Sequence, residues 1–264
     1  RYFFEGTDVE LVPCKVISDV FLATVNGRTD WSVIPIENTI EGSVSLHVDW
    51  LVHNVDLPIR AEWVYPSVQH LIGRRSVPLD KIEKIISHPV ALPQCRHFLE
   101  SHFPDVEYEH ASSTAEGVRI VKANPDKPWA AVGTRLAAER NGLDILHENI
   151  MDHNDNYTRF ILVGPEPVRH KPAERYKTSL LVTLPEDYPG ALHQVLSAFA
   201  WRRINLSKIE SRPTKKKLGT YFFFIDVEES MDSVLLPAAL SEIEAIGAQV
   251  RILGSYPSYA FHGA

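Results

Sequence analysis

The sequence predicts an α/β protein built from two parts in series, and three observations support this prediction. Strand-like and helix-like segments alternate over the first two-thirds of the 264 residues, which favours an α/β fold with a largely parallel sheet. Residues 164–177 carry three prolines, several charges and few apolar side chains, a composition typical of a linker. Beyond this stretch the predicted elements follow the order βαββαβ, which is that of a ferredoxin-like unit of about 85 residues.

The elements of the first part are predicted from periodicity and from helix caps. Short apolar runs bounded by polar loops predict strands, and apolar side chains at helical spacing predict helices. Thr134 is a suitable N-cap and Gly142 a suitable stop for one of the helices, and Ser or Thr residues precede another. Strands are expected at residues 9–14, 31–39, 82–89, 106–111 and 129–133, and helices at residues 18–27, 91–103, 112–124 and 134–142.

The second part has a compact pattern. The helix expected at residues 190–204 places Leu192, Val195, Leu196 and Phe199 on one face. Pro237 must lie in the first turns of the second helix or kink it. The basic run 215–217 is expected in a solvated hairpin loop. Strands are expected at residues 178–185, 205–213, 218–228 and 249–257, and the second helix at residues 233–247.

Composition narrows the class of protein. A formal net charge of −7 argues against a general nucleic-acid binder, which is usually basic. Cys14 and Cys95 form neither a disulfide framework nor a CxxC metal pair, so two reduced thiols in a cytoplasmic protein are expected. No window approaches 18 uninterrupted apolar residues, and the opening residues lack the pattern of a signal peptide, so no membrane association is expected.

Small polar clusters follow three of the predicted strands. They are Glu37-Asn38-Thr39, Ser87-His88 and Ser112-Ser113-Thr114. One such cluster is usually only a helix cap, but several at strand ends can form a crevice that accepts anions.

The stretch HNDNYTRFILVG, residues 153–164, places Thr158-Arg159-Phe160 at the mouth of an apolar strand. One interpretation is structural, because a loop ends there and Thr is a good strand residue. The other is chemical, because α/β folds place reactive groups at strand ends that face a crevice.

Five stretches resemble motifs of a known family. PIENTIEGSV (35–44), SHPVALPQC (87–95) and NYTRFIL (156–162) resemble the three signature stretches of the prephenate dehydratase family. GALHQVL (190–196) and KIESRP (208–213) resemble the phenylalanine-binding motifs of its regulatory module, the ACT domain. All five occur in the family's order, and this order together with the plan of strands covers almost the whole chain.

The resemblance implies a fold and its boundaries. It implies a two-lobed, periplasmic-binding-protein-like catalytic domain with a cleft at residues 1–165, a linker at 166–177 and an ACT domain at 178–264. Lobe 1 is expected at about 1–74 and 156–165, and lobe 2 at about 75–155. The sequence departs from the family at three points: a Gly-Pro-x-Gly-Thr-Phe turn is not found near Tyr2-Phe3-Phe4, Val90 stands for the usual Gln, and Thr39 stands for a frequent Ser.

The resemblance also implies a reaction. Prephenate loses CO2 and its ring hydroxyl, giving phenylpyruvate and water, and the ring's gain in aromaticity makes a cofactor or metal unnecessary. Thr158 is the implied proton donor for the leaving oxygen, and it must be positioned and polarised by its neighbours. The implied catalytic residues are Thr158, Asn38 and Ser87, and the implied substrate-binding residues are Glu37, Gln94, Ser113, Thr114, Arg159 and Phe160.

Several of these roles have structural alternatives. Arg159 either pairs with a substrate carboxylate or reaches back to Glu37 or Glu41, because a buried Arg is usually paired. Phe160 either forms a pocket wall or packs in the core. His88 is either a general acid or part of a shaped turn. Glu37 is either an acid or a group that orients Asn38 or pairs with Arg159.

For the regulatory half, the resemblance implies that L-phenylalanine binds between two ACT modules. The Gly190-Ala191-Leu192 turn at a helix N-terminus suits the ligand's carboxylate, and Asn205 and the Glu210-Ser211 edge of KIESRP suit its ammonium group. Without the resemblance, that motif is only a strand edge that ends at Pro213. A shared site requires at least a homodimer, and a homotetramer built as a dimer of dimers is expected. The implied effector-binding residues are Gly190, Ala191, Leu192, Asn205, Glu210 and Ser211.

Two other functions remain open at this point. Arogenate dehydratase performs the same chemistry on the amino-acid analogue of prephenate, and no residue decides between the two substrates. A non-catalytic small-molecule-binding protein is also compatible with a cleft and a sensing module. The presence of Thr158 argues against this second alternative.

Overall fold

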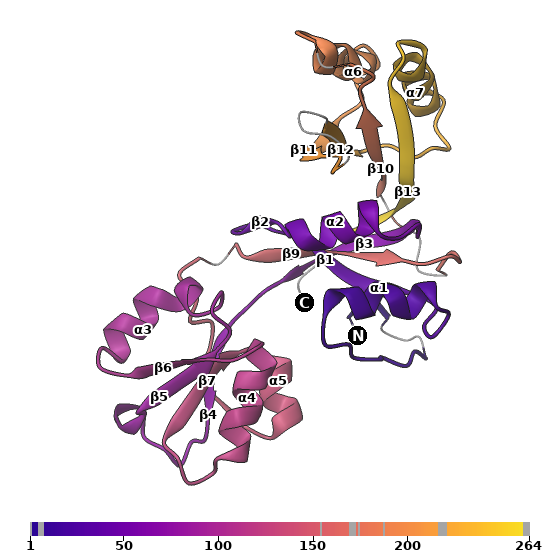
Figure 1. Cartoon of the computed structure of the whole chain (residues 1–264). Coiled ribbons are helices and arrows are strands. Elements are labelled where there is room, and N and C mark those ends of the chain that lie inside the picture. The colour runs from indigo at the N-terminus through magenta and orange to yellow at the C-terminus, as the bar shows by residue number, and fades with distance from the viewer. Residues whose placement is uncertain are drawn as a thin grey trace. The chain divides into compact units, whose positions relative to one another are not determined.

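The computed structural model describes residues 2–4, 8–153, 155–168, 173, 175–186, 188–215 and 221–260. The chain divides into two compact units. Unit 1 comprises Arg1–Tyr65 and Thr158–Ala264, and unit 2 comprises Pro66–Tyr157. Figure 1 labels most of the helices and strands of both units. No helix of the described residues is long and apolar enough to span a membrane.

Unit 1 is organised around one eight-stranded sheet with the order β11-β12-β10-β13-β3-β9-β1-β2. Near its end, β13 pairs in parallel with β3, with Ser258 opposite Glu62, so the C-terminal βαββαβ module and the first lobe share this sheet. The elements are η1 (Tyr2–Phe4), α1 (Ile17–Val25), β1 (Ser32–Asn38), β2 (Gly42–Ser43), α2 (Ser45–His53), β3 (Ile59–Pro66), β9 (Tyr157–Val163), β10 (Arg175–Thr183), α6 (Ala191–Ala200), β11 (Leu206–Pro213), β12 (Tyr221–Val227), α7 (Leu235–Ala245) and β13 (Gln249–Tyr259).

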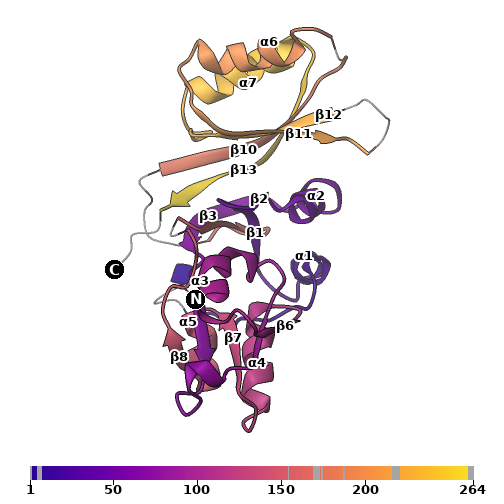
Figure 2. The same cartoon turned by 90° about the vertical axis from the view of Figure 1, so that its left-hand side faces the viewer.

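The order β10-α6-β11-β12-α7-β13 confirms the predicted βαββαβ module. Val195 and Phe199 of α6 are buried, as their helical spacing predicts, and Pro237 occupies the first turn of α7, where a proline is tolerated. One face of the module's sheet packs against α6 and α7, and the other shares a core with Leu51 and its neighbours on α2 (Figure 2). The module is therefore packed on both faces, and the first lobe provides one of the two layers.

Unit 2 contains a five-stranded sheet with the order β6-β5-β7-β4-β8. Strand β5 runs parallel to both β6 and β7, and Ser87 lies opposite His110, so the polar ends of two parallel strands meet at one edge. The predicted caps are confirmed, because Ser113 accepts a hydrogen bond from the Glu116 amide and Gly142 ends α5 with φ +64°. The elements are β4 (His70–Gly73), η2 (Leu79–Lys81), β5 (Lys84–Ser87), η3 (Pro93–Cys95), α3 (Arg96–His102), β6 (Glu107–His110), α4 (Thr114–Ala123), β7 (Trp129–Gly133), α5 (Arg135–Asn141) and β8 (Asp144–His147).

The structure corrects three expectations about the elements. The sheets are mixed rather than largely parallel, because β1–β9, β10–β13 and most other pairs run antiparallel. No strand forms at residues 9–14, where Leu11 and Val12 are exposed and the apolar run has no paired neighbour. Strand β4 belongs to the sheet of unit 2, although residues up to 74 were assigned to the first lobe. The sequence patterns also missed α2, β2, β3, β4 and β8.

The basic run 215–217 is described only at its first residue. Lys215 forms an ion pair with Asp49 on α2, with Nζ 2.6 Å from Oδ2. Lys216 and Lys217 lie outside the described residues.

Candidate active site and effector site

Thr158 stands at the start of β9, directly opposite Asn38 at the end of β1. The Asn38 amide Nδ2 donates a hydrogen bond to the Thr158 hydroxyl oxygen over 3.1 Å. The Asn38 side-chain oxygen Oδ1 accepts from the backbone amides of Ile40 (2.9 Å) and Glu41 (3.1 Å), and these two bonds fix which way the side-chain amide points. Because the donor is aimed at Oγ1, it lowers the energy of any negative charge on that oxygen.

Arg159 projects from the opposite face of β9, because successive side chains of a strand alternate. Its Nε donates to Glu62 Oε2 (2.6 Å), and its Nη1 donates to Asp226 Oδ2 (2.5 Å) and Glu37 Oε2 (3.3 Å). Its Nη2 lies 2.5 Å from the same Glu62 oxygen and donates to the Tyr256 hydroxyl over 3.2 Å. All three guanidinium nitrogens are therefore paired within the chain.

This pairing favours the structural alternative for Arg159. Burial by itself lowers the pKa of the Arg159 guanidinium, but the neighbouring Asp226, Tyr256 and Glu62 raise the pKa above its ordinary value. The side chain is 8% exposed and stays charged inside the unit. The structure does not support the predicted contact of Arg159 with a substrate carboxylate, because no guanidinium nitrogen is left over for it.

Glu37 and Phe160 also take the structural alternatives. The Glu37 carboxylate lies 3.3 Å from Arg159 Nη1 and 3.2 Å from Lys208 Nζ, so it bridges two cations. The Phe160 ring stacks on Trp63 with 5.8 Å between ring centroids. The predicted substrate-binding role of these two residues therefore has no support in their contacts.

Ser87 ends β5 and is completely buried. Its hydroxyl donates to the Val132 carbonyl on β7 over 2.7 Å and so ties two strands of unit 2 together. The predicted catalytic role of Ser87 is not supported, because a buried hydroxyl that is bonded to the backbone does not reach a substrate. His88 Nδ1 accepts from the Val90 amide over 3.3 Å, which favours the interpretation of His88 as part of a turn.

Gln94 supports the loop that precedes β9. Its side-chain oxygen accepts from Asn156 Nδ2 (3.0 Å), and its carbonyl accepts from the Asp152 amide (2.8 Å). Asn156 is 1% exposed, and its carbonyl accepts from the Ser67 amide. The sequence predictions assign no role to Asn156. Its position as the first residue of NYTRFIL, a stretch that resembles a family motif, was the one feature that pointed to it.

Ser113 and Thr114 lie at the start of α4, next to the end of β6. The Ser113 hydroxyl oxygen accepts from the Glu116 amide over 3.0 Å, so it acts as the helix cap. That bond uses the oxygen and leaves the hydroxyl hydrogen for another acceptor, so the predicted donation to a substrate carboxylate stays a prediction.

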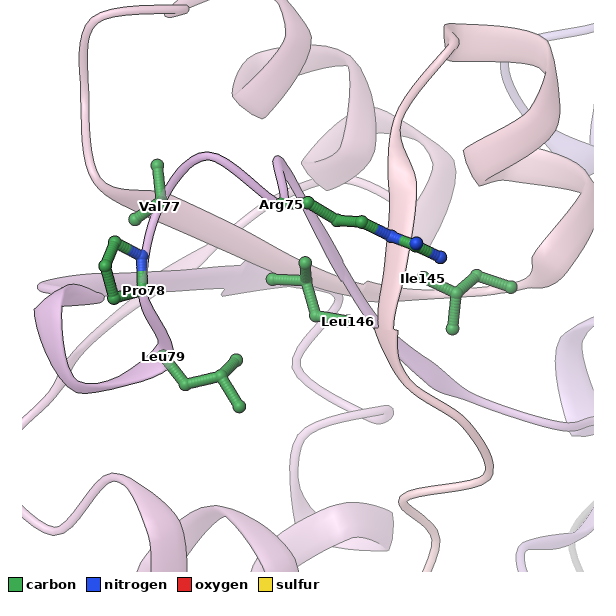
Figure 3. A pocket seen from close by; sticks show the side chains of 6 residues that line it. All are labelled: Arg75, Val77, Pro78, Leu79, Ile145 and Leu146. Atoms are coloured by element: carbon green, nitrogen blue, oxygen red, sulfur yellow. The ribbon is translucent and has the colours of Figure 1, made fainter.

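A hollow of about 420 Å³ lies elsewhere in unit 2, between the turn after β4 and strand β8 (Figure 3). The one ionisable side chain in its lining is Arg75, which extends toward Ile145 and pairs with Asp144 over 3.5 Å. None of the predicted site residues lines this hollow. Its lining residues are Arg75, Val77, Pro78, Leu79, Ile145 and Leu146.

Four of the predicted effector residues lie near the ends of α6, and the other two, Glu210 and Ser211, lie on β11. Gly190, with φ +94°, begins the helix, and a side chain there would be strained. Asn205 follows the helix and donates to Glu228 over 2.7 Å. A helix of 10 residues is ~15 Å long, so Gly190 is separated by that length from the C-terminal end of α6, which Asn205 follows. Ala191 is buried, Leu192 is half-buried, and Ser211 is exposed on β11.

Glu210 is engaged within the chain. It accepts from Ser43 Oγ (2.6 Å) and from Arg212 Nη1 (2.5 Å), and Lys208 Nζ lies 3.4 Å away. Burial raises the pKa of the Glu210 carboxyl, but these hydrogen bonds and charges lower it below its ordinary value overall. Glu210 is thus a charged carboxylate at the junction between β11 and β2.

The remaining titratable groups show no metal-binding arrangement. Within the described part of the chain, no three His, Cys, Asp or Glu side chains are grouped so that they could hold a metal ion. Cys14 and Cys95 are both free, and burial raises the pKa of the Cys95 thiol to about 12.

These features define a class of protein: an α/β scaffold with polar groups at its strand ends, continued by a ferredoxin-like βαββαβ module. The family model for prephenate dehydratase matches residues 1–168, and the model for the ACT domain matches residues 178–246. The chain therefore belongs to the prephenate dehydratase family, and it is a lyase.

Two similar proteins carry the family's name, and a third similar structure is described by a different activity. The prephenate dehydratase of Bacillus subtilis is 45% identical, over 95% of this chain and 90% of that protein. The solved structure of prephenate dehydratase from Arthrobacter aurescens in complex with L-Phe is 38% identical, with a TM-score of 0.82 over 93% of this chain and 80% of that one. A solved structure described as a novel type of quorum-quenching acylase, GqqA, is 29% identical, with a TM-score of 0.81 over 94% of this chain and 89% of that one.

Proposed function

We propose that this chain converts prephenate to phenylpyruvate, CO2 and water, with Thr158 as the proton donor. The observation that carries this assignment is the hydrogen bond of 3.1 Å from Asn38 to the Thr158 hydroxyl, between residues that are paired across two strands. The reaction is inferred from the family membership, and the hydrogen-bonded Asn38 and Thr158 provide a hydroxyl that can act as the acid.

In the reaction, the bond between the ring and its carboxylate breaks and releases CO2. The electron pair of that bond enters the ring, and the bond to the ring hydroxyl breaks on the other side. The hydroxyl leaves as water when it takes the Thr158 proton, and the Asn38 amide stabilises the charge left on Oγ1. Gln94, Ser113 and Thr114 remain proposed contacts for the substrate carboxylates.

Substitution of Thr158 tests the assignment. Thr158→Ala removes the hydroxyl and should lower kcat by about 100-fold or more, whereas Thr158→Ser keeps a hydroxyl and should retain most of the activity. Phenylpyruvate formation from prephenate by the full chain is the measurement, and arogenate in parallel assays determines the substrate preference. Wild-type turnover in the Ala variant would contradict the role of Thr158.

We also propose that L-phenylalanine inhibits the enzyme through the ACT module. The complex of the Arthrobacter relative with L-Phe supports this proposal, as does the match to the ACT family model. The length of α6, which lies between Gly190 and Asn205 in the chain, favours a site that takes one end from each of two modules. The exposed side chains of Trp201 (80%) and Ile209 (45%) support association of modules as a homodimer or homotetramer.

The effector proposal has its own measurement. Phenylalanine should lower turnover of the wild type and should bind the Thr158→Ala variant with unchanged affinity, because the two sites share no residues. Light scattering with and without phenylalanine gives the oligomeric state, and a monomer that still binds phenylalanine tightly would contradict a shared site. We expect the enzyme in the cytoplasm, which the two free cysteines support.

A further inference from the structure

We propose that Asp226, a carboxylate on β12 of the ACT module, is a positioning residue for Thr158 and acts through Arg159. The proposal rests on the proposed role of Thr158 in the dehydratase reaction. It assigns to the regulatory module a direct part in the geometry of the active-site strand, even when no effector is bound.

Asp226 belongs to a closed ring of four buried side chains. Its Oδ2 accepts from Arg159 Nη1 (2.5 Å), and its Oδ1 accepts from Ser179 Oγ (2.5 Å). Ser179 Oγ lies 2.6 Å from the Tyr256 hydroxyl, which accepts from Arg159 Nη2 (3.2 Å) and closes the ring. Asp226, Ser179 and Tyr256 are fully buried and come from three strands of the ACT module, β12, β10 and β13.

The ring holds β9 from the face opposite to Thr158. Arg159 and Thr158 are neighbours in the chain, and their cross-strand partners on β1 are Glu37 and Asn38. A shift or rotation of β9 at Arg159 must therefore also move Thr158 relative to Asn38. Proton transfer depends steeply on the placement of the donor, and a displacement of about 1 Å can cost about 100-fold in rate.

Among the residues that the structure describes, Arg159 is the one cation paired with Asp226, whereas Glu62 pairs with both Arg159 and Lys177. Replacing Asp226 by Asn removes one negative charge from Arg159 and keeps the size of the side chain. Glu62 and Glu37 still hold the guanidinium, so we expect the variant to fold with Arg159 drawn toward these two carboxylates.

The variant Asp226→Asn has a matched control in Asp49→Asn. Asp49 on α2 pairs with the buried Arg212 on β11, so it too joins the first lobe to the ACT module by a carboxylate–arginine pair, but neither residue lies on β9 or β1. Tyr256→Phe is a second, nearly isosteric variant that opens the ring without changing its formal charge. Turnover on prephenate is measured without phenylalanine, and thermal unfolding and phenylalanine binding show that each variant is folded.

We expect kcat to fall by about 10- to 100-fold in Asp226→Asn and less in Tyr256→Phe, while KM stays close to the wild-type value. Asp49→Asn should keep the wild-type kcat.

If the wild type is active and both ring variants, Asp226→Asn and Tyr256→Phe, keep the wild-type kcat, the proposal is overturned and the proposed function still stands. An equal loss in Asp49→Asn would also overturn it, because the effect would then reflect the junction in general. A wild type that is inactive on both prephenate and arogenate would overturn the proposed function, and this proposal with it. If Asp226→Asn does not fold, the kcat of Tyr256→Phe alone tests the proposal.

Discussion

Thr158 and Arg159 are adjacent in the chain, yet they belong to different environments. Thr158 shares a strand face with Phe160 and meets Asn38, whereas Arg159 points into a buried set of carboxylates. The sequence alone allowed both side chains to contact the substrate. The strand separates them, because successive residues point to opposite faces of a sheet.

Ser87 gives a prediction at the same scale. Its buried hydroxyl donates to the Val132 carbonyl, so Ser87→Ala leaves that carbonyl without its partner. We expect the free energy of unfolding to fall by about 1–3 kcal/mol and kcat to stay unchanged. Urea denaturation and turnover measure the two effects. Ser101→Ala is the control, because the Ser101 hydroxyl also donates to a backbone carbonyl but is exposed. A large loss of kcat in a stable Ser87→Ala protein would restore the catalytic role.

At the scale of elements, the placement of α4 depends on a glycine. A Cβ atom added at Gly117 would lie 2.8 Å from the Ile86 carbonyl oxygen and 3.3 Å from the Ser87 Cα. The helix therefore approaches β5 more closely than any side chain at this position would permit. This approach sets Ser113 and Thr114 at the start of α4 beside the polar end of β5.

Gly117→Ala should destabilise the protein even though Ala favours helices by about 1 kcal/mol over Gly. The overlap is with backbone atoms that have little room to move, so we expect a net loss of about 1–3 kcal/mol in the free energy of unfolding. Urea denaturation is the measurement. Ala115→Gly, at an exposed position of the same helix, should cost only about 1 kcal/mol. An equal or higher stability of Gly117→Ala would show that α4 can move away from β5 without cost.

At the scale of the whole molecule, unit 1 joins the first lobe and the ACT module in one sheet and one core. Ion pairs lie at the rim of this junction, between α2 of the first lobe and β11 of the ACT module. Arg212 pairs with both Asp49 and Glu210, and Lys215 pairs with Asp49. The junction is therefore held by apolar burial, by the buried pair of Arg159 and Asp226, and by ionised carboxylates at its rim.

This junction predicts an acid-dependent loss of stability. Burial raises the pKa of Asp49, but its hydrogen bonds with Lys215 and Arg212 lower it overall, and the pKa of Glu210 is lowered as well. A carboxyl whose pKa is lower in the folded state stabilises it above the unfolded pKa of about 4, and this contribution is lost as pH falls through the folded value. The double variant Asp49→Asn, Glu210→Gln should lose less unfolding free energy than the wild type between about pH 6 and pH 3. Denaturant titrations at each pH test this, and parallel curves for the two proteins would contradict it.

Local sequence determined a large part of this protein. Helix spacing, caps and strand-like runs gave the βαββαβ module, α4, α5 and their ends, because these features depend on residues within one or two turns. The order of five motif-like stretches gave the family, and with it Thr158 and Asn38, which the strands then bring together.

Only the tertiary structure decided the surroundings of Arg159 and the continuity of the sheet. Glu62 and Tyr256 are each 97 positions from Arg159, and Asp226 is 67 positions away, so no local pattern could pair them. Strands β2, β3, β4 and β8 were missed because their stability comes from partners elsewhere in the chain. Burial then decided between the alternatives that the sequence left open for Arg159 and Ser87. A buried charge must be paired and a buried hydroxyl must be hydrogen-bonded, so both side chains have structural partners.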